Sequence, residues 1–518
     1  MRYNKLAATA YFLLLTTVLF LSGYQNRFGI APDDFYRQFQ QDSEALVLGR
    51  IVASEYGRRL PEHANLGYAS VRFFAYRPEY ILQSYALLGR RALADIKVAA
   101  DRVETENRAG AAQPASSITV EYNPTLEDYI GRKILLDPTP RVITSVTRSG
   151  PFASLHVSGP VLGQLDPARP ITLSGARVEA DAIALTPYLS QFGLQGMVFS
   201  ELYRDLGGNL HRLYGLNSLA FALTIVALAF LYGRIFPKTF TALFFLTIAL
   251  SPWITSFARN LYWVPFSWFL PAVLAAAWFL AGSRRQRALY GVLLYLAFLA
   301  KCLAGYEYIS SIILLAAAPF LYAFFQPGAG QSRARAARGF CAVCLIGVAG
   351  FASALLIHAG LRGDTLLAGL RSIYELDVKR RTYGDPYAFG SELFAALSAS
   401  PLSVLKTYIL SWHTELVPFV PGLAFAALLL GAALTLLYKW SLSAKDAAAE
   451  IGLFVAFLLP PISWFVLAKG HSGIHTHINY VLWYFGFVAT LAYLCLDGLR
   501  TAARSIHSRI PRAKTDKA

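Results

Sequence analysis

Two acidic residues follow the first apolar segment of the chain and could act as a general base. Asp42 and Glu44 lie in an amphipathic stretch, residues 33–56, whose apolar side chains recur at near-helical spacing. An acid held at a membrane surface could deprotonate an acceptor hydroxyl or help to hold a divalent cation. On a helix these two side chains diverge by about 200°, so only one of them can face an acceptor. An ordinary solvated helix face is the alternative.

Cationic, amide and aromatic residues lie at the ends of later apolar segments, where they could hold a phosphate or a sugar ring. Arg, Lys and His side chains donate strong hydrogen bonds to phosphate oxygens. Aromatic faces bordered by hydrogen-bonding groups suit sugar rings. The predicted substrate-binding residues are Arg259, Asn260, Tyr262, Lys301, Glu307, Lys469, His471, His475 and His477.

Two of these groups have alternative interpretations. A charge inside a membrane is costly, so Lys301 and Glu307 could simply pair with each other. The three histidines from His471 to His477 could bind zinc, but no Cys or acid stands beside them. We therefore predict no metal site there and favour a phosphate. No cofactor is predicted, and a divalent cation bound near Asp42 and Glu44 is kept as an alternative.

The composition is that of a membrane protein. Of 518 residues, 55% are hydrophobic and only 15% are charged, against about 25% charged residues in soluble proteins. The formal net charge of +16 lies largely in short basic connections and in the tail, so we predict membrane lipids and no nucleic acid as partners. The four cysteines lie in apolar stretches, where small packing residues are expected.

About ten apolar stretches are long enough to cross a bilayer, the first at residues 6–21. Short loops rich in Lys and Arg mark the cytoplasmic side. These basic connections are residues 234–238, 284–287, 333–338, 439–445 and 500–517. The chemically interesting residues occupy the other set of connections. We therefore predict that both termini are cytoplasmic and that the active site faces the outside.

The predicted fold is mainly α and polytopic, with a large outer first loop. Within that loop, residues 33–56 and 80–99 read as amphipathic helices. The spacing of the apolar side chains then changes from helical to alternating. Residues 117–185 therefore predict a small β-rich module with strands near 118–122, 141–146, 154–158 and 171–174. The predicted parts are a first transmembrane helix (1–23), an extracytoplasmic loop domain (24–212), a transmembrane domain (213–498) with an outer loop at 359–418, and a basic cytoplasmic tail (499–518).

This layout resembles the GT-C class of polytopic glycosyltransferases. The resemblance covers one helix, a large outer loop with an early acidic motif, and a run of hydrophobic helices. It implies an essential acid in the first outer loop, which by position matches Asp42 or Glu44. This sequence departs from the class in two ways: no tight Asp-Glu pair stands directly after the first helix, and a β-rich insert is not general there.

The sequence thus predicts an enzyme of a bacterial-type inner membrane that moves a sugar from a polyprenyl-phosphate donor to an acceptor. The acceptor could be a glycan, a lipid or a protein. Two alternatives stay open. A membrane polysaccharide polymerase or ligase would use similar outer Arg and His residues. A non-catalytic transporter would place its charges at mid-membrane, often with repeat symmetry, and an assembly protein would show no cavity that joins these motifs.

Overall fold

The structure is a computed structural model of the chain. The residues that it describes are 2–71, 94–98, 102–106, 115–121, 130–131, 133–136, 139–150, 152–158, 171–176, 183–326 and 332–509. Contacts divide the chain into two compact units. Met1–Phe39 together with Tyr214–Ala518 form a helical unit, and Gln40–Leu213 form a second unit.

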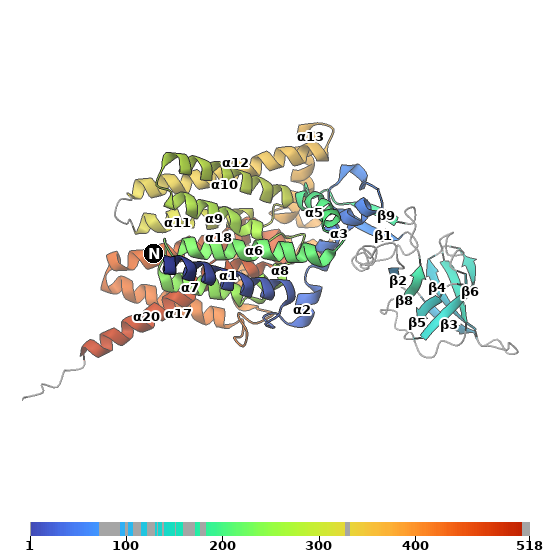
Figure 1. The fold of residues 1–518 in the computed structure, drawn as a ribbon, viewed down its shortest axis with the longest axis horizontal. Helices are drawn as coiled ribbons and strands as arrows, with labels where there is room; N and C mark the ends of the chain where they lie inside the picture. Colours follow the sequence, from blue (N-terminus) through green and yellow to red (C-terminus); the bar gives the residue numbers. More distant parts are fainter. Residues whose placement is uncertain are drawn as a thin grey trace, which may run out of the picture. The chain divides into compact units, whose positions relative to one another are not determined.

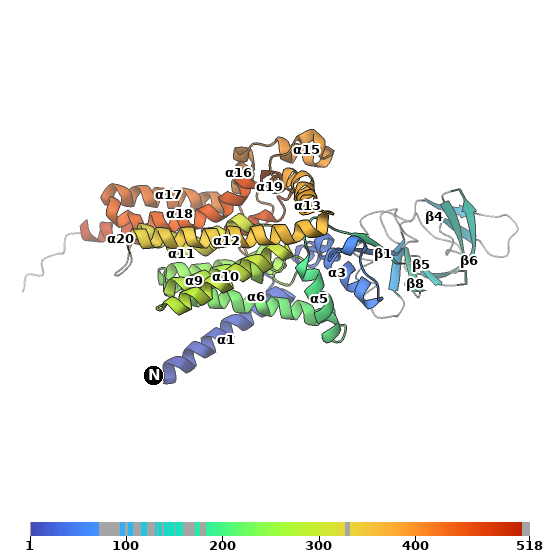
Figure 2. The same cartoon turned by 90° about the horizontal axis from the view of Figure 1, so that it is seen from above.

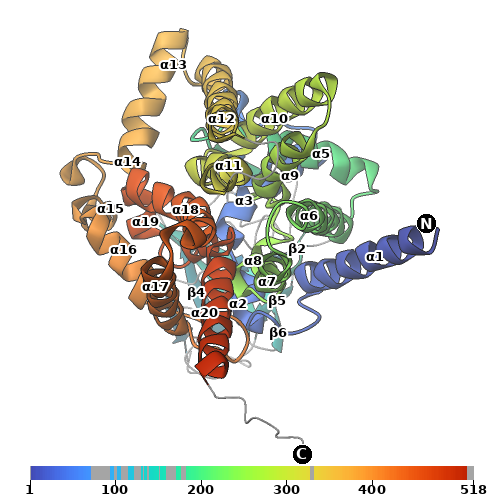
Figure 3. The same cartoon turned by 90° about the vertical axis from the view of Figure 1, so that its left-hand side faces the viewer.

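The helical unit is built from long helices that lie side by side (Figure 1), and Figure 3 views most of them nearly end-on. The helices that lie wholly or mostly in this unit are α1 (Arg2–Gln25), α2 (Asp33–Gln38), α6 (Leu210–Tyr232), α7 (Lys238–Ala249), α8 (Pro252–Phe257), α9 (Phe266–Leu280), α10 (Arg284–Ala304), α11 (Ile309–Phe325), α12 (Arg333–Arg362), α13 (Leu366–Ile373), α14 (Lys379–Arg381), α15 (Ser391–Ser398), α16 (Pro401–Leu410), α17 (Ala424–Leu442), α18 (Ala444–Leu467), α19 (Lys469–Ile474) and α20 (Phe487–Arg509).

Six described helices are long and apolar enough to cross a membrane: α1, α6, α10, α12, α17 and α18. The count becomes seven if the bent pair α15–α16, with an angle of 94° between its helices, is one span. Three further apolar helices, α7, α9 and α11, have only 10–17 residues, against about 20 for a straight span. The structure therefore supports a mainly helical, polytopic membrane protein, with fewer long spans than the predicted ten.

The basic connections gather at one end of the helical unit. The start of α1, the turns before α10 and α12 and the end of α20 lie at this end, whereas α13, α15 and α19 lie toward the opposite end (Figures 1 and 2). Arg284 and Arg333 begin α10 and α12 there. The outer loop predicted at 359–418 and the histidine segment thus belong to the end away from the basic turns.

The second unit combines helices with strands. Helices α3 (Gln41–Glu55) and α5 (Leu194–Asp205) pack together, and α3 also packs against β1 (Gly67–Val71). Strand β1 pairs antiparallel with β9 (Ile183–Pro187). Gly49 allows the close approach of α3 to β1, because a Cβ at this position would lie 2.0 Å from the carbonyl oxygen of Gly67.

A seven-stranded antiparallel sheet completes the described part of this unit, in the order β2-β8-β5-β6-β7-β4-β3. Strand β6 joins the two halves of the sheet, because residues 139–142 pair with β5 and residues 143–149 pair with β7, with a register shift between Ile143 and Ser145. Ile143, Leu155 and Val157 are buried on one face. The strands are β2 (Ala94–Val98), β3 (Arg102–Glu106), β4 (Ala115–Glu121), β5 (Lys133–Leu136), β6 (Thr139–Ser149), β7 (Phe152–Ser158) and β8 (Ile171–Ala176).

Three predicted elements differ in the structure. The amphipathic stretch 33–56 is two helices, because Gln40 adopts a left-handed conformation (φ 53°) between α2 and α3. In the stretch 80–99, residues 94–98 form β2 rather than a helix, and residues 80–93 lie outside the described part of the chain. The predicted span at 478–496 begins with a 3₁₀-helix, Asn479–Tyr484, and α20 starts only after Gly486 (φ 109°).

Candidate functional site

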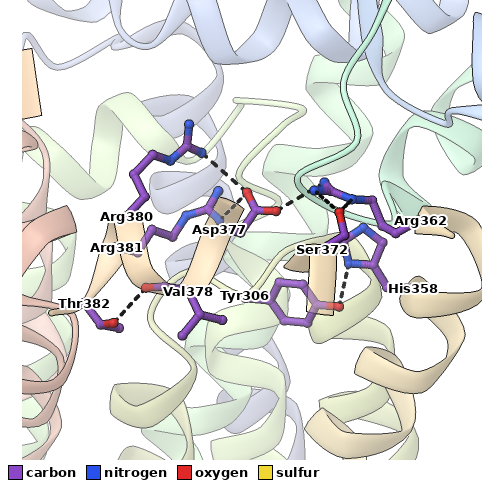
Figure 4. Close-up of polar contacts among 9 residues, drawn as sticks. All are labelled: Tyr306, His358, Arg362, Ser372, Asp377, Val378, Arg380, Arg381 and Thr382. Carbon is purple, nitrogen blue, oxygen red and sulfur yellow. Dashed lines mark hydrogen bonds and ion pairs between the residues drawn. The ribbon is translucent and has the colours of Figure 1, made fainter. Parts of the chain in front are cut away.

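Three arginines meet one buried aspartate at the end of α12. Oδ1 of Asp377 lies 3.0 Å from Nη1 of Arg381 and 3.5 Å from Nη2 of Arg380, and Oδ2 lies 3.2 Å from Nη1 of Arg362. Arg380 and Arg381 reach the carboxylate from one side, and Arg362 reaches it from the other (Figure 4). We call these four residues the arginine cluster. Within the cluster, cationic groups outnumber the anionic one.

A π-helical turn presents Asp377 to the arginines. Helix α13 continues into a π-helix, Tyr374–Val378, and then into α14. The two arginines of α14 follow Asp377 by three and four residues, so they lie on the same helix face. Arg362 comes from the last turn of α12, and its Nη2 also donates to Ser372 Oγ at 3.2 Å. Such π-helical turns are rare and are frequently found at functional sites.

The arginine cluster adjoins the segment that carries the predicted histidines. The N–H of Gly470 on α19 donates to the carbonyl of Thr382, directly after α14, at 3.3 Å. A Cβ on Gly470 would lie 2.8 Å from the carbonyl oxygen of Arg380, so the lack of a side chain permits this approach. The predicted histidines and the arginine cluster therefore share one region of the helical unit.

Lys469 is buried at the start of this segment, and its ammonium group holds the end of α15. Nζ donates to the carbonyls of Leu397 at 2.6 Å and Ala399 at 2.8 Å, and it lies 5.2 Å from the centroid of the Tyr383 ring. Carbonyls at a helix C-terminus lack intrahelical partners and are stabilised by cations. These contacts give Lys469 a positioning role between α15 and α19, and its predicted contact with phosphate stays a prediction.

The three predicted histidines form one contiguous group. The ring centroid of His475 lies 4.5 Å from that of His471 and 5.6 Å from that of His477. His471 is buried against Trp464, with a centroid distance of 5.4 Å, and its Nδ1 lies 3.4 Å from the amide nitrogen of Asn479. The rings of His471 and His475 are therefore held in place by packing.

Burial keeps the inner histidines neutral at physiological pH. Burial, together with His477 and the two arginines of α14, lowers the pKa of His475 to about 4. Burial and the same charged neighbours place the pKa of His471 well below its usual range. Nδ1 of His475 is buried without a hydrogen-bond partner among the described residues. A neutral imidazole has one N–H to donate, so His475 can serve an anionic ligand without carrying a charge of its own.

We expect acid to destabilise the protein through His475. The unfolded chain takes up this proton near pH 6.5 and the folded chain near 4, so the unfolded state binds more protons between these values. The free energy of unfolding should therefore fall as the pH drops from about 7 toward 4. The apparent Tm of the detergent-solubilised chain, compared at pH 7.5 and 5.5, should fall less in His475→Gln than in the wild type.

The exposed His413 supplies the matched control, because His413→Gln should keep the wild-type response. An equal acid-induced loss in the wild type and in His475→Gln would contradict this account of the histidine.

The segment between α10 and α11 borders the helix that ends in the arginine cluster. Lys301 and Glu307 are both buried, and Nζ of Lys301 donates to the carbonyl of Gly305 at 2.6 Å. The hydroxyl of Tyr306 lies 3.1 Å from Nδ1 of His358 on α12, one turn before Arg362 (Figure 4). This predicted pair of charges thus lies next to a residue that contacts the last turns of α12.

Arg259, Asn260 and Tyr262 stabilise the turn after α8. The guanidinium carbon of Arg259 lies 4.3 Å from the ring centroid of Tyr36 and 5.4 Å from that of Tyr214, which are cation–π contacts. Oδ1 of Asn260 accepts the N–H of Tyr262 at 3.0 Å. These contacts join the turn to α2 and α6, and their predicted role in substrate binding stays a prediction.

The two candidate acids lie in the second unit, in the first turn of α3. Asp42 is exposed, whereas Glu44 is buried, with 6% of its surface exposed. Side chains two residues apart on a helix point in different directions, which accounts for this difference. A general base must be held in one position, and the buried Glu44 meets that condition better than the exposed Asp42.

The arginine cluster itself was not among the predicted site residues. The segment Lys379–Arg381 lies in the predicted outer loop, residues 359–418, which places three consecutive basic residues on the side where basic residues are depleted. That departure from the charge rule is the sequence signal that could have found it. Arg362 also lies within residues 359–418, but as a single basic residue it gives a weaker signal.

Among the described residues, no group of three His, Cys, Asp or Glu side chains could hold a metal ion. Comparison of the chain with protein-family models, curated proteins and solved structures finds no match. The functional assignment therefore rests on the residues and their arrangement.

Proposed function

We propose that the chain is an integral membrane glycosyltransferase that moves a sugar from a polyprenyl-phosphate donor to an acceptor on the extracytoplasmic side. The observation that carries the proposal is the arginine cluster beside His471 and His475, at the end of the helical unit away from the basic turns. Guanidinium groups match the geometry of phosphate oxygens. Arg380 and Arg381 keep 37% and 18% of their side-chain surface exposed, so a ligand can reach them.

The proposed reaction is a single displacement at the anomeric carbon. Glu44 accepts the proton of the acceptor hydroxyl. The oxygen of that hydroxyl forms the new bond to the anomeric carbon of the sugar. The bond between the sugar and the phosphate oxygen breaks, and the polyprenyl phosphate leaves with the electron pair. Arg380 and Arg381 stabilise the charge that develops on this leaving group, and the N–H of His475 supplies a further donor.

The proposal includes the finer topology of the chain. Helices α7, α9, α11 and α20 complete ten crossings together with the six longer ones, and both termini are cytoplasmic in a plasma membrane. The short lengths of α7, α9 and α11 are compatible with crossing where neighbouring protein, rather than lipid, surrounds the chain. The β-rich module at residues 117–185 is a recognition or packing unit of the outer loop.

Sided labelling tests this topology. In a cysteine-free background, Ser149→Cys in the β-sheet should react with a membrane-impermeant maleimide added to intact cells. Arg285→Cys, in a basic turn, should react only after the membrane is permeabilised. Both positions are exposed on the protein, so access to the reagent decides the outcome. Labelling of both positions from the same face would contradict the arrangement.

Lipid binding tests the donor class without knowledge of the sugar. The purified chain in nanodiscs should retain added polyprenyl phosphate in native mass spectrometry, in preference to phosphatidylglycerol at the same concentration. The double variant Arg380→Gln/Arg381→Gln should lose this preference, and Arg371→Gln, which alters an exposed arginine of α13, should keep it. A wild type that binds both lipids equally would contradict the proposed donor.

A further inference from the structure

We propose that Asp377 makes the arginine cluster selective for a donor with a single phosphate and against one with a diphosphate. The inference rests on the proposed function, since it concerns the same phosphate site. It assigns to this buried carboxylate a role in specificity, in addition to its role in holding the arginines.

The carboxylate already occupies the position where the three guanidinium groups converge. Its Oδ1 faces Arg380 and Arg381, and its Oδ2 faces Arg362, so both oxygens have cationic partners (Figure 4). Asp377 and Arg362 expose only 4% and 6% of their side chains. The inner part of the cluster is thus filled by the protein's own anion, and an incoming ligand can approach only the outer pair, Arg380 and Arg381.

Charge then distinguishes the two donor classes. A first phosphate on Arg380 and Arg381 finds two cations, and it shares them with Asp377. The second phosphate of a diphosphate brings further negative charge beside a carboxylate that is shielded from water. Like charges repel strongly at short distance where the surroundings are poorly polarisable, and such repulsion is a means of rejecting a wrong ligand. Removal of the Asp377 charge should therefore favour the diphosphate more than the monophosphate.

The geometry around Asp377 also supplies a matched control. Glu375 lies in the same π-helix and pairs with Lys379 at 2.6 Å, with 45% of its side chain exposed. Its replacement by glutamine removes the same charge two residues away, outside the arginine cluster. Asp377→Glu keeps the charge inside the cluster but changes the shape of the side chain. It therefore tests whether the charge or the shape of Asp377 determines the selectivity for a monophosphate.

The experiment is isothermal titration of the detergent-solubilised full chain with farnesyl monophosphate and, separately, farnesyl diphosphate. The measured quantity is the ratio of the two Kd values within each variant, which does not depend on the fraction of protein that is folded. The wild type, Glu375→Gln and Asp377→Glu should favour the monophosphate. Asp377→Asn should shift the ratio toward the diphosphate by about ten-fold.

The outcomes separate this inference from the proposed function. Binding of both ligands by the wild type, with the same ratio in Asp377→Asn, would overturn the role of Asp377 and leave the phosphate site intact. A wild type that binds neither ligand would overturn the phosphate site, and this inference with it. A shift of the same size in Glu375→Gln would show that the effect comes from general surface charge, which also contradicts the proposal.

Discussion

Replacement of Glu44 by glutamine is expected to reduce sugar transfer by about 10²–10⁴-fold, the usual contribution of a general base. Glutamine keeps the size and hydrogen-bonding capacity of the side chain and removes only its ability to take a proton. The buried position of Glu44 on α3 makes it the acid of the pair that can be held against an acceptor. The measurement is the turnover of the reconstituted chain with saturating donor and acceptor.

The matched control is Asp42→Asn, two residues earlier on the same helix and exposed. It should transfer sugar at nearly the parental rate. A parental rate in both amide variants would show that the acidic motif is only a polar helix face, and the proposed mechanism would then be wrong. A loss in Asp42→Asn alone would move the role of base to Asp42.

Replacement of Arg381 by glutamine is expected to raise the KM for the donor by about 10–100-fold. A hydrogen bond to a charged group contributes about 1.5–3 kcal/mol, and each 1.4 kcal/mol corresponds to a factor of ten in binding. Nη1 of Arg381 lies 3.0 Å from Oδ1 of Asp377, and the arginine side chain remains partly exposed. Its guanidinium can therefore contact both the carboxylate and a ligand. Kinetics with varied donor concentration measure this effect.

Loss of Arg381 also weakens the contact with Asp377, so stability must be followed in parallel. Arg371→Gln removes an exposed arginine from the neighbouring helix α13 and should change neither KM nor the apparent Tm. An unchanged donor KM in a folded Arg381→Gln variant would contradict the assignment of this arginine to the phosphate.

The sequence predicted best the elements whose periodicity depends on their own residues. Long apolar runs must form helices in a membrane, because only then are their backbone groups satisfied. The alternation in residues 154–158 places Leu155 and Val157 on the buried face of β7. In contrast, Asn479–Tyr484 lies at the start of a predicted span, yet it forms a 3₁₀-helix. Contacts from distant residues hold it, such as the bond from Trp483 Nε1 to the Tyr408 carbonyl at 3.1 Å.

The candidate site also depends on contacts between residues that are distant in the sequence. His471, His475 and His477 lie close together in the sequence, and their grouping was visible there. The arginine cluster requires Arg362, at the end of α12, to meet Asp377 in a π-helical turn after α13. The hydrophobic pattern of the sequence reports neither this packing nor the π-helical turn. The sequence therefore indicated the grouping of the histidines but not the arginine cluster beside them.

The most direct test of the central claim is a cryo-electron microscopy structure of the full chain in nanodiscs with added polyprenyl phosphate. The claim is that Arg380 and Arg381 bind the phosphate of a polyprenyl-phosphate donor. We predict that the phosphate lies within about 3 Å of the guanidinium nitrogens of Arg380 and Arg381. A phosphate bound elsewhere, with the arginine cluster intact and empty, would contradict the account.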